Sequence, residues 1–186
     1  MSVLHAPTYR WTVEEYEELG RTGFFDENDR VELLNGEIVI MSPIGYRHAT
    51  AVTRLTNFLA RRSGGRFDVS PQNPFNLDPR SQPQPDLTLL DPKCDKLPRH
   101  PEPEEIFLII EVSDSTVRYD RQDKCPAYAA RRVREFWLLN LDENVLEVFR
   151  EPAGPAYRDV RILAPTETIA PLAFPDLELR VGDFLP

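Results

Sequence analysis

The sequence predicts one α/β domain that spans residues 1–186. Residues Glu105–Val112 form a continuous apolar run of strand length, which is typical of a central strand buried on both faces. Residues Tyr46–Arg62 carry apolar side chains at helical spacing, and Ser63-Gly64-Gly65 ends that pattern. A length of 186 residues with 41% hydrophobic positions suits one core, and we find no repeat or linker.

The N-terminal third predicts a short helix followed by a hairpin. Thr12 and Glu15 have capping-box spacing, so we expect a surface helix over Thr12–Leu19 that ends at Gly20. Asn35-Gly36 lies between two apolar runs, the strongest short hairpin signal. A two-residue turn pairs Leu33 with Ile38 on an apolar face. It also pairs Glu32 with Val39 on a mixed face, away from the expected core.

The rest of the chain predicts strands and one more helix. The helix lies within Arg121–Arg132, where Pro126 is acceptable only in the first turn. Two runs joined by a short loop, Glu135–Asn140 and Val145–Arg150, predict a second hairpin at the sheet. The other expected strands are Arg66–Ser70, Phe75–Leu77, Gln84–Leu90 and short pieces of the tail Tyr157–Pro186 such as Leu177–Val181.

The composition excludes several classes of protein. The longest apolar stretches are far shorter than the roughly 20 residues that cross a bilayer, and Met1–Arg10 contains no apolar signal region. Two cysteines without metal-ligand spacing favour a reducing, cytoplasmic location. The net charge of −9 counts against nucleic-acid binding by bulk electrostatics, although an enzyme needs only a local basic path.

Two carboxylates at strand ends are the main chemical signal. Glu111 ends the most hydrophobic strand, and Asp86 follows Pro85 at the start of another strand. If these strands are neighbours, the two side chains form a hard-oxygen site that suits Mg²⁺ or Mn²⁺. The alternative is simple exposure of both carboxylates to solvent.

Lys124 strengthens this interpretation because the chain has only three lysines. A lysine beside a metal-bound water can stabilise the charge of a phosphoryl transition state. The alternative is a solvated lysine at the start of a helix.

These residues resemble the PD-(D/E)XK nuclease superfamily, with Ser113 at the place of the usual motif lysine. Within it, the chain resembles the Uma family of putative restriction endonucleases, first catalogued as a bacterial domain of unknown function. The matching blocks are Thr12–Tyr16, Val31–Ile38, Met41–Pro43, Pro83–Leu87, Ile110–Thr116, Tyr119-Asp120, Lys124, Tyr128 and Glu135–Leu138.

The resemblance implies a restriction-endonuclease-like core, a mixed sheet flanked by helices, as one domain. It implies that Asp86 and Glu111 bind the divalent metal and that the Val112 carbonyl completes the site. Lys124 matches a lysine that has migrated to the following helix. Glu32 matches an acidic residue that serves as a further metal ligand or positions water.

Two further residues are auxiliary candidates. His48, at the start of the Tyr46–Arg62 helix, can contact a phosphate or a carboxylate that supports the metal, or it can be an ordinary satisfied histidine. Gln84 would share a face with Asp86 if the strand has already begun, and could then orient water or contact a base.

The expected function is Mg²⁺- or Mn²⁺-dependent hydrolysis of DNA phosphodiester bonds by Asp86, Glu111, Lys124 and Glu32, with DNA assigned from the resemblance. One alternative is a catalytically silent, dimeric binding or regulatory module of the same fold. Another is a phosphoesterase that acts on RNA or nucleotides. Exposed apolar strands in the Glu135–Arg150 hairpin would suit a homodimer.

Overall fold

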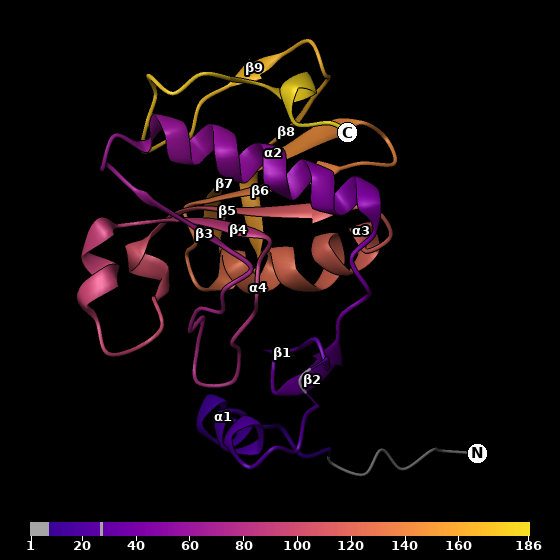
Figure 1. Cartoon of the computed structure of the whole chain (residues 1–186), viewed down its shortest axis with the longest axis vertical. Coiled ribbons are helices and arrows are strands. Elements are labelled where there is room, and N and C mark those ends of the chain that lie inside the picture. Colours follow the sequence, from indigo (N-terminus) through magenta and orange to yellow (C-terminus); the bar gives the residue numbers. More distant parts are fainter. Residues whose placement is uncertain (1–7, 27) are drawn as a thin grey trace.

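A mixed six-stranded sheet organises the molecule, with helices on both of its faces (Figure 1). The computed structural model describes residues 8–26 and 28–186, so most of Met1–Arg10 lies outside the described residues. The strand order is β3-β4-β5-β6-β7-β8, in which β5 and β6 are parallel and every other neighbouring pair is antiparallel. This confirms the predicted α/β class with a mixed sheet.

The elements of the sheet and its covering helices follow one another along the chain. Helix α2 covers one face, and α3 and α4 cover the other (Figure 1). Their bounds are α2 Tyr46–Ser63, β3 Asp68–Pro71, β4 Leu87–Leu90, β5 Ile106–Ser113, α3 Val117–Tyr119, α4 Cys125–Ala130, β6 Glu135–Asn140, β7 Val145–Ala153 and β8 Ala156–Leu163.

Two smaller units lie outside the main sheet. Helix α1 (Val13–Arg21) and the hairpin of β1 (Val31–Leu34) and β2 (Glu37–Ile40) lie at the end of the molecule remote from α2 (Figure 1). Strands β9 (Thr168–Ile169) and β10 (Leu179–Arg180) pair in the C-terminal tail.

The core consists of two apolar layers, one on each face of the sheet. Leu55 and Leu59 of α2 pack with one layer, which contains the fully buried Trp137. Tyr128 of α4 packs with Phe136 in the other layer. Strand β5 is buried along nearly its whole length, as its continuous apolar sequence predicts.

The local signals at the N-terminal elements are confirmed. Thr12 and Glu15 form the capping box of α1, and Gly64 ends α2 in the left-handed conformation. Leu33 pairs with Ile38 as expected. Gly36 has φ 77°, and a Cβ there would lie 2.8 Å from the Arg10 Cβ, so both the turn and the close approach require glycine.

The predicted strand at Phe75–Leu77 is wrong, although its side chains are buried as a strand's would be. Its amides donate to three separate carbonyls: Phe75 N–H to Pro83, Asn76 N–H to Pro101 and Leu77 N–H to Ser81. Phe75 and Leu77 bond the stretch 81–83 and Asn76 bonds Pro101, and none of these partners belongs to a strand of the sheet, so no extended ladder forms.

The helix that carries Lys124 begins earlier than predicted, at Val117. A π-helical turn, Asp120–Lys124, joins α3 to α4. The Cys125 N–H bonds the Asp120 carbonyl, an i to i−5 bond, just before Pro126, which has no N–H to donate. The wider turn lets the helical path continue through the proline.

The predicted hairpin of β6 and β7 is confirmed, but the expected exposure of its apolar strands, on which the homodimer hypothesis rested, is wrong. Both strands lie inside the sheet, between β5 and β8, and their side chains are largely buried. Strand β8 takes the edge position instead.

None of the helices in residues 8–26 and 28–186 is both long and apolar enough to cross a membrane.

Truncating the sheet centre should cost far more stability than truncating its edge. Leu108 of β5 is fully buried, so we expect Leu108→Ala to lower the free energy of unfolding by about 2–5 kcal/mol in urea denaturation. Ile162 of β8 is exposed, so Ile162→Ala is the matched control and should cost less than about 0.5 kcal/mol. Similar losses for both variants would contradict the strand order.

Candidate active site

The sheet register brings the two predicted carboxylates together. Strand β4 runs antiparallel to β5 and pairs Leu87 with Ile110, so the residue before β4 lies beside the residue after Ile110. The Asp86 N–H donates to Glu111 Oε2 at 3.3 Å, and the Val112 N–H donates to Asp86 Oδ2 at 2.9 Å. The predicted meeting of Asp86 and Glu111 is therefore confirmed.

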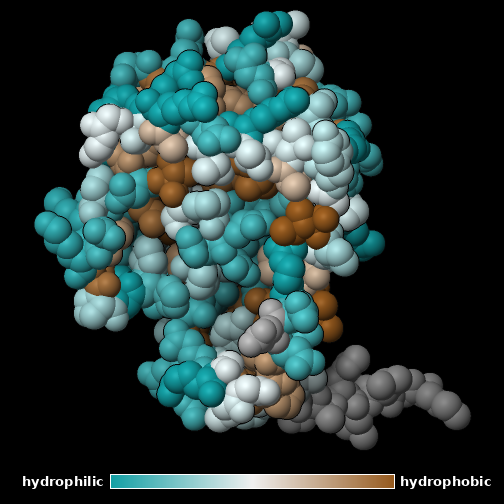
Figure 2. Space-filling model, viewed as in Figure 1, coloured by the Kyte–Doolittle hydropathy of each residue, from teal (hydrophilic) through white to brown (hydrophobic). Residues whose placement is uncertain are grey.

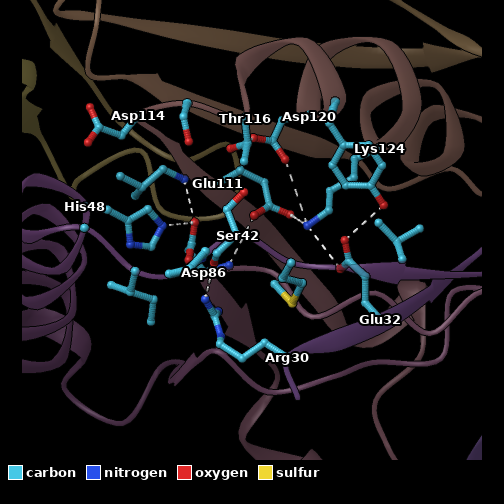
Figure 3. Close-up of a pocket in the computed structure, with 18 of the residues that line it drawn as sticks. Arg30, Glu32, Ser42, His48, Asp86, Glu111, Asp114, Thr116, Asp120 and Lys124 are labelled. Atoms are coloured by element: carbon cyan, nitrogen blue, oxygen red, sulfur yellow. Dashed lines mark hydrogen bonds and ion pairs between the residues drawn. The ribbon is translucent and has the colours of Figure 1, made fainter. Parts of the chain in front are cut away.

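Lys124 is almost fully buried, not solvated, and its ammonium lies among three carboxylates (Figure 3). Its Nζ is 3.0 Å from Glu111 Oε1 and 3.2 Å from Glu32 Oε2. The third carboxylate, Asp120, is 4.0 Å away. The π-helical turn thus brings the lysine to the end of β5.

Glu32 corrects the expectation from the hairpin pattern. It is buried to 1% exposure, whereas Ile40, on the face expected to be apolar and inward, is exposed. Glu32 Oε1 accepts from the Tyr119 hydroxyl at 3.0 Å, and Oε2 accepts from the Gln84 N–H at 2.9 Å as well as from Lys124. Both faces of β1 are buried, since Leu33 on the apolar face is also 0% exposed. Glu32 can be buried on the mixed face because this polar cluster satisfies its carboxylate.

The sequence analysis did not select Asp120 as a site residue. Its Oδ2 accepts from the hydroxyls of Ser113 and Thr116 at 2.5 and 2.7 Å. The i, i+4 spacing of Asp120 and Lys124 was the available signal, because that spacing places both on one helix face.

The two auxiliary candidates have different outcomes. His48 Nε2 lies 3.0 Å from Asp86 Oδ2, so this histidine contacts a carboxylate of the site. Its Nδ1 is buried and has no hydrogen-bond partner among the described residues. The Gln84 side chain donates to the Gln72 carbonyl at 2.5 Å, and the residue serves the site through its backbone N–H.

Burial and charge shift the ionisation of the cluster. Burial is the main cause that raises the pKa of Glu111 to about 8; Lys124 opposes the shift and the neighbouring carboxylates reinforce it. Burial alone would lower the pKa of Lys124, but Glu111, Glu32 and Asp120 together raise it well above its ordinary value. Burial likewise raises the pKa of Asp120. Lys124 is therefore an ammonium ion at neutral pH.

A cavity of about 270 Å³ opens onto this cluster. Its walls include the site residues Glu32, His48, Asp86, Glu111, Val112, Asp120 and Lys124. Arg30 also lines it and donates to the Ser42 carbonyl at 2.9 Å. The sequence analysis missed Arg30, although it lies two residues before Glu32, on the same strand face if the extended backbone continues.

The donor set fits one divalent cation at Asp86 and Glu111. Three carboxylates lie around Lys124, and Asp86 lines the same cavity. Asp86 Oδ1 accepts no hydrogen bond from any described residue. No three Asp, Glu, His or Cys side chains in the described part of the chain gather in metal-binding geometry. Val112 lines the same cavity.

Comparisons with known proteins agree with this architecture. The family model Uma2, described as "Putative restriction endonuclease", matches residues 13–182. A crystal structure of a putative nuclease belonging to DUF820 from Anabaena variabilis superposes with a TM-score of 0.72 at 14% identity, covering 93% of this chain and 96% of that one. No curated protein matches this chain. The structural match shows a shared fold.

Glu111→Gln should remove a pH-dependent part of the stability measured without metal. A folded pKa of about 8, above the ordinary 4.5, means that the folded state keeps a proton that the unfolded state releases. Wild-type stability should therefore fall by up to about 1.4 kcal/mol per pH unit between these values. Glutamine does not titrate, so the variant lacks this loss of stability. The melting temperature of the variant minus that of wild type should therefore rise with pH up to about pH 8 and stay constant above it.

The exposed carboxylate Asp95 supplies the control for this measurement. Asp95→Asn should give a profile parallel to that of wild type. A parallel profile for Glu111→Gln as well would contradict the assignment of the shifted carboxyl to Glu111.

Proposed function

Because this chain belongs to the Uma2 family of putative restriction endonucleases, we propose that it is a metal-dependent endonuclease that hydrolyses DNA phosphodiester bonds. The observation that carries the proposal is the buried ammonium of Lys124, 3.0 Å from Glu111 on the cavity that Asp86 also lines. This is the set of groups that a PD-(D/E)XK site requires, with its lysine supplied from the helix after β5.

The carboxylates of Asp86 and Glu111, with the Val112 carbonyl, would hold Mg²⁺ or Mn²⁺, which polarises the scissile phosphate and lowers the pKa of a bound water. The chemistry of the donor set supports this, since all three offer hard oxygens on one cavity. His48, at 3.0 Å from Asp86 Oδ2, fixes the orientation of that carboxylate.

Lys124 acts by its charge and not as a base. Its raised pKa keeps the ammonium protonated at neutral pH, so it has no lone pair with which to accept a proton from water. A fixed positive charge in a water-poor site stabilises the negative charge that develops on the phosphate oxygens during attack.

Glu32 positions this lysine. Both of its oxygens already accept hydrogen bonds, from Tyr119 on one side and from Gln84 and Lys124 on the other. This set of contacts favours support of Lys124 over direct ligation of the metal, the other role implied by the family resemblance.

Purified protein should convert supercoiled plasmid to nicked or linear DNA in Mg²⁺ or Mn²⁺ but not in EDTA. We expect Asp86→Asn and Lys124→Met each to lower the cleavage rate by at least about a hundredfold, because each removes a group in contact with the metal or the developing charge. Lys93 is a surface lysine, and Lys93→Met should cleave like wild type.

Other results would redirect the assignment. Cleavage that survives Asp86→Asn would locate the activity elsewhere. Metal-dependent cleavage of RNA or of nucleotide diesters without DNA cleavage would favour the phosphoesterase alternative, and no cleavage of any of these substrates would favour the silent binding module.

Glu32→Gln separates the two roles of Glu32. If Glu32 positions Lys124, the variant should lower the cleavage rate about tenfold or more at saturating Mn²⁺ while the Mn²⁺ concentration for half-maximal rate stays unchanged. A rise in that concentration, with the maximal rate restored by excess Mn²⁺, would instead make Glu32 a metal ligand.

A further inference from the structure

Arg30 is the cation at the cavity that is free to bind a ligand. Among the described residues that line the cavity, the arginines and lysines are Arg30 and Lys124. Lys124 is committed to carboxylates, whereas Arg30 has no carboxylate within ion-pair distance in the described part of the chain and makes one hydrogen bond, to the Ser42 carbonyl. Figure 3 shows Arg30 extending into the pocket from the β1 side, with most of its guanidinium donors unused.

An apolar rim borders the same cavity. We define this rim as Ile40, Ile44 and Tyr46, which lie where β2 leads into α2 and are 84%, 43% and 83% exposed. Ile40 and Ile44 line the cavity itself. Figure 2 shows hydrophobic side chains at the surface along the connection between β2 and α2. Tyr46 follows Ile44 by two residues, at the start of α2. Large exposed apolar side chains concentrated in one short stretch of chain beside a cavity are typical of a binding surface.

The chemistry of Arg30 and the rim selects their ligand. A guanidinium with free donors binds a phosphate oxygen. A tyrosine ring stacks favourably on the flat face of a base, and isoleucine side chains can pack against the same apolar surface. In a duplex those faces are already covered by stacking between the bases. A phosphodiester with bare bases on either side satisfies both features, whereas an intact duplex offers the rim nothing apolar of comparable size.

We propose that Arg30 and the rim form the substrate-binding face of the site and select a nucleic-acid strand whose bases are unpaired next to the scissile phosphate. This rests on the proposed nuclease function and specifies the form of its substrate. Arg30 anchors a backbone phosphate at the cavity, and Tyr46 and Ile44 contact the faces of the neighbouring bases.

The charge of the whole chain favours this mode over groove binding. With a net charge of −9, a long track of backbone phosphates along a duplex would meet mostly repulsion. Apolar contact with bases adds affinity without further cations. Binding of a few nucleotides of one unpaired strand is therefore compatible with an acidic protein.

The test is binding of fluorescein-labelled DNA of about 20 nucleotides, single-stranded or as its duplex, by fluorescence anisotropy with Ca²⁺ in place of Mg²⁺. We expect the full-length protein to bind the single strand at least about tenfold more tightly than the duplex. Tyr46→Ala should lose about tenfold in single-strand affinity and leave duplex affinity unchanged, and Tyr46→Phe should restore it. Phe24→Ala, an exposed aromatic outside the rim, is the control.

Arg30→Gln should weaken binding of both DNA forms by the same factor and lower the slope of log affinity against log salt by about one, as loss of one phosphate contact predicts. Arg134→Gln, an exposed arginine without an ion pair among the described residues, should change neither. Ile44→Ser should behave like Tyr46→Ala.

Equal affinity of wild type for both DNA forms, or Tyr46→Ala and Ile44→Ser binding like Phe24→Ala, would overturn the proposal. So would rim variants that change only the mass of the protein in light scattering, which would identify a surface for a second copy. Cleavage without single-strand preference would overturn this inference alone, whereas rim-dependent binding without cleavage would overturn the proposed function alone.

Discussion

The arrangement of the site depends on one buried cation. Lys124 takes its ammonium out of water into contact with Glu111 and Glu32, at 3.0 and 3.2 Å, and desolvation of these charges is unfavourable unless hydrogen bonds complete the cluster. The surrounding groups supply those bonds: the hydroxyls of Tyr119 and Tyr128 and the Gln84 N–H all donate to these carboxylates. Removing one charged side chain of the cluster would leave its partner as an uncompensated buried charge. The cluster therefore holds together the elements that carry Glu32, Glu111 and Lys124.

This cluster explains why the N-terminal hairpin lies where it does. Strands β1 and β2 are not part of the main sheet, yet Glu32 of β1 reaches the end of β5. The same hairpin then leads into α2 through the rim and delivers His48 to Asp86. The segment from β1 to the start of α2 therefore forms a wall of the cavity and supplies two of its polar side chains, Glu32 and His48.

The distribution of charge across the cavity is uneven, and the difference matters for substrate binding. Three carboxylates surround Lys124 and Asp86 lines the same cavity, so a phosphate can enter only with compensating positive charge. The mouth instead offers Arg30 and apolar side chains. An overall acidic protein can therefore hold an anionic polymer at one point, provided that cations and base contacts are concentrated there.

The sequence by itself determined the elements whose signals are local and the identity of the residues that meet at the candidate site. The Thr12 capping box, the Asn35-Gly36 turn and the glycine that ends α2 act within a few residues, so their positions follow from the chain alone. Asp86 and Glu111 were predicted as carboxylates at strand ends and Lys124 as one of three lysines in the chain, with their roles taken from the family resemblance. The structure brings these three onto one cavity.

Tertiary structure alone decided which face of a strand is inside and what each buried charge contacts. The hairpin pattern placed Glu32 away from the core, but partners 52 and 87 residues away, Gln84 and Tyr119, hold it in a buried position. Leu33 on the predicted apolar face is buried as well, so both faces of β1 are inside. The sequence of β6 and β7 predicts a hairpin with exposed apolar strands. In the structure β8 occupies the edge of the sheet, so β6 and β7 lie inside it. Burial depends on contacts between segments distant in the sequence, and periodicity within one segment carries no information about them.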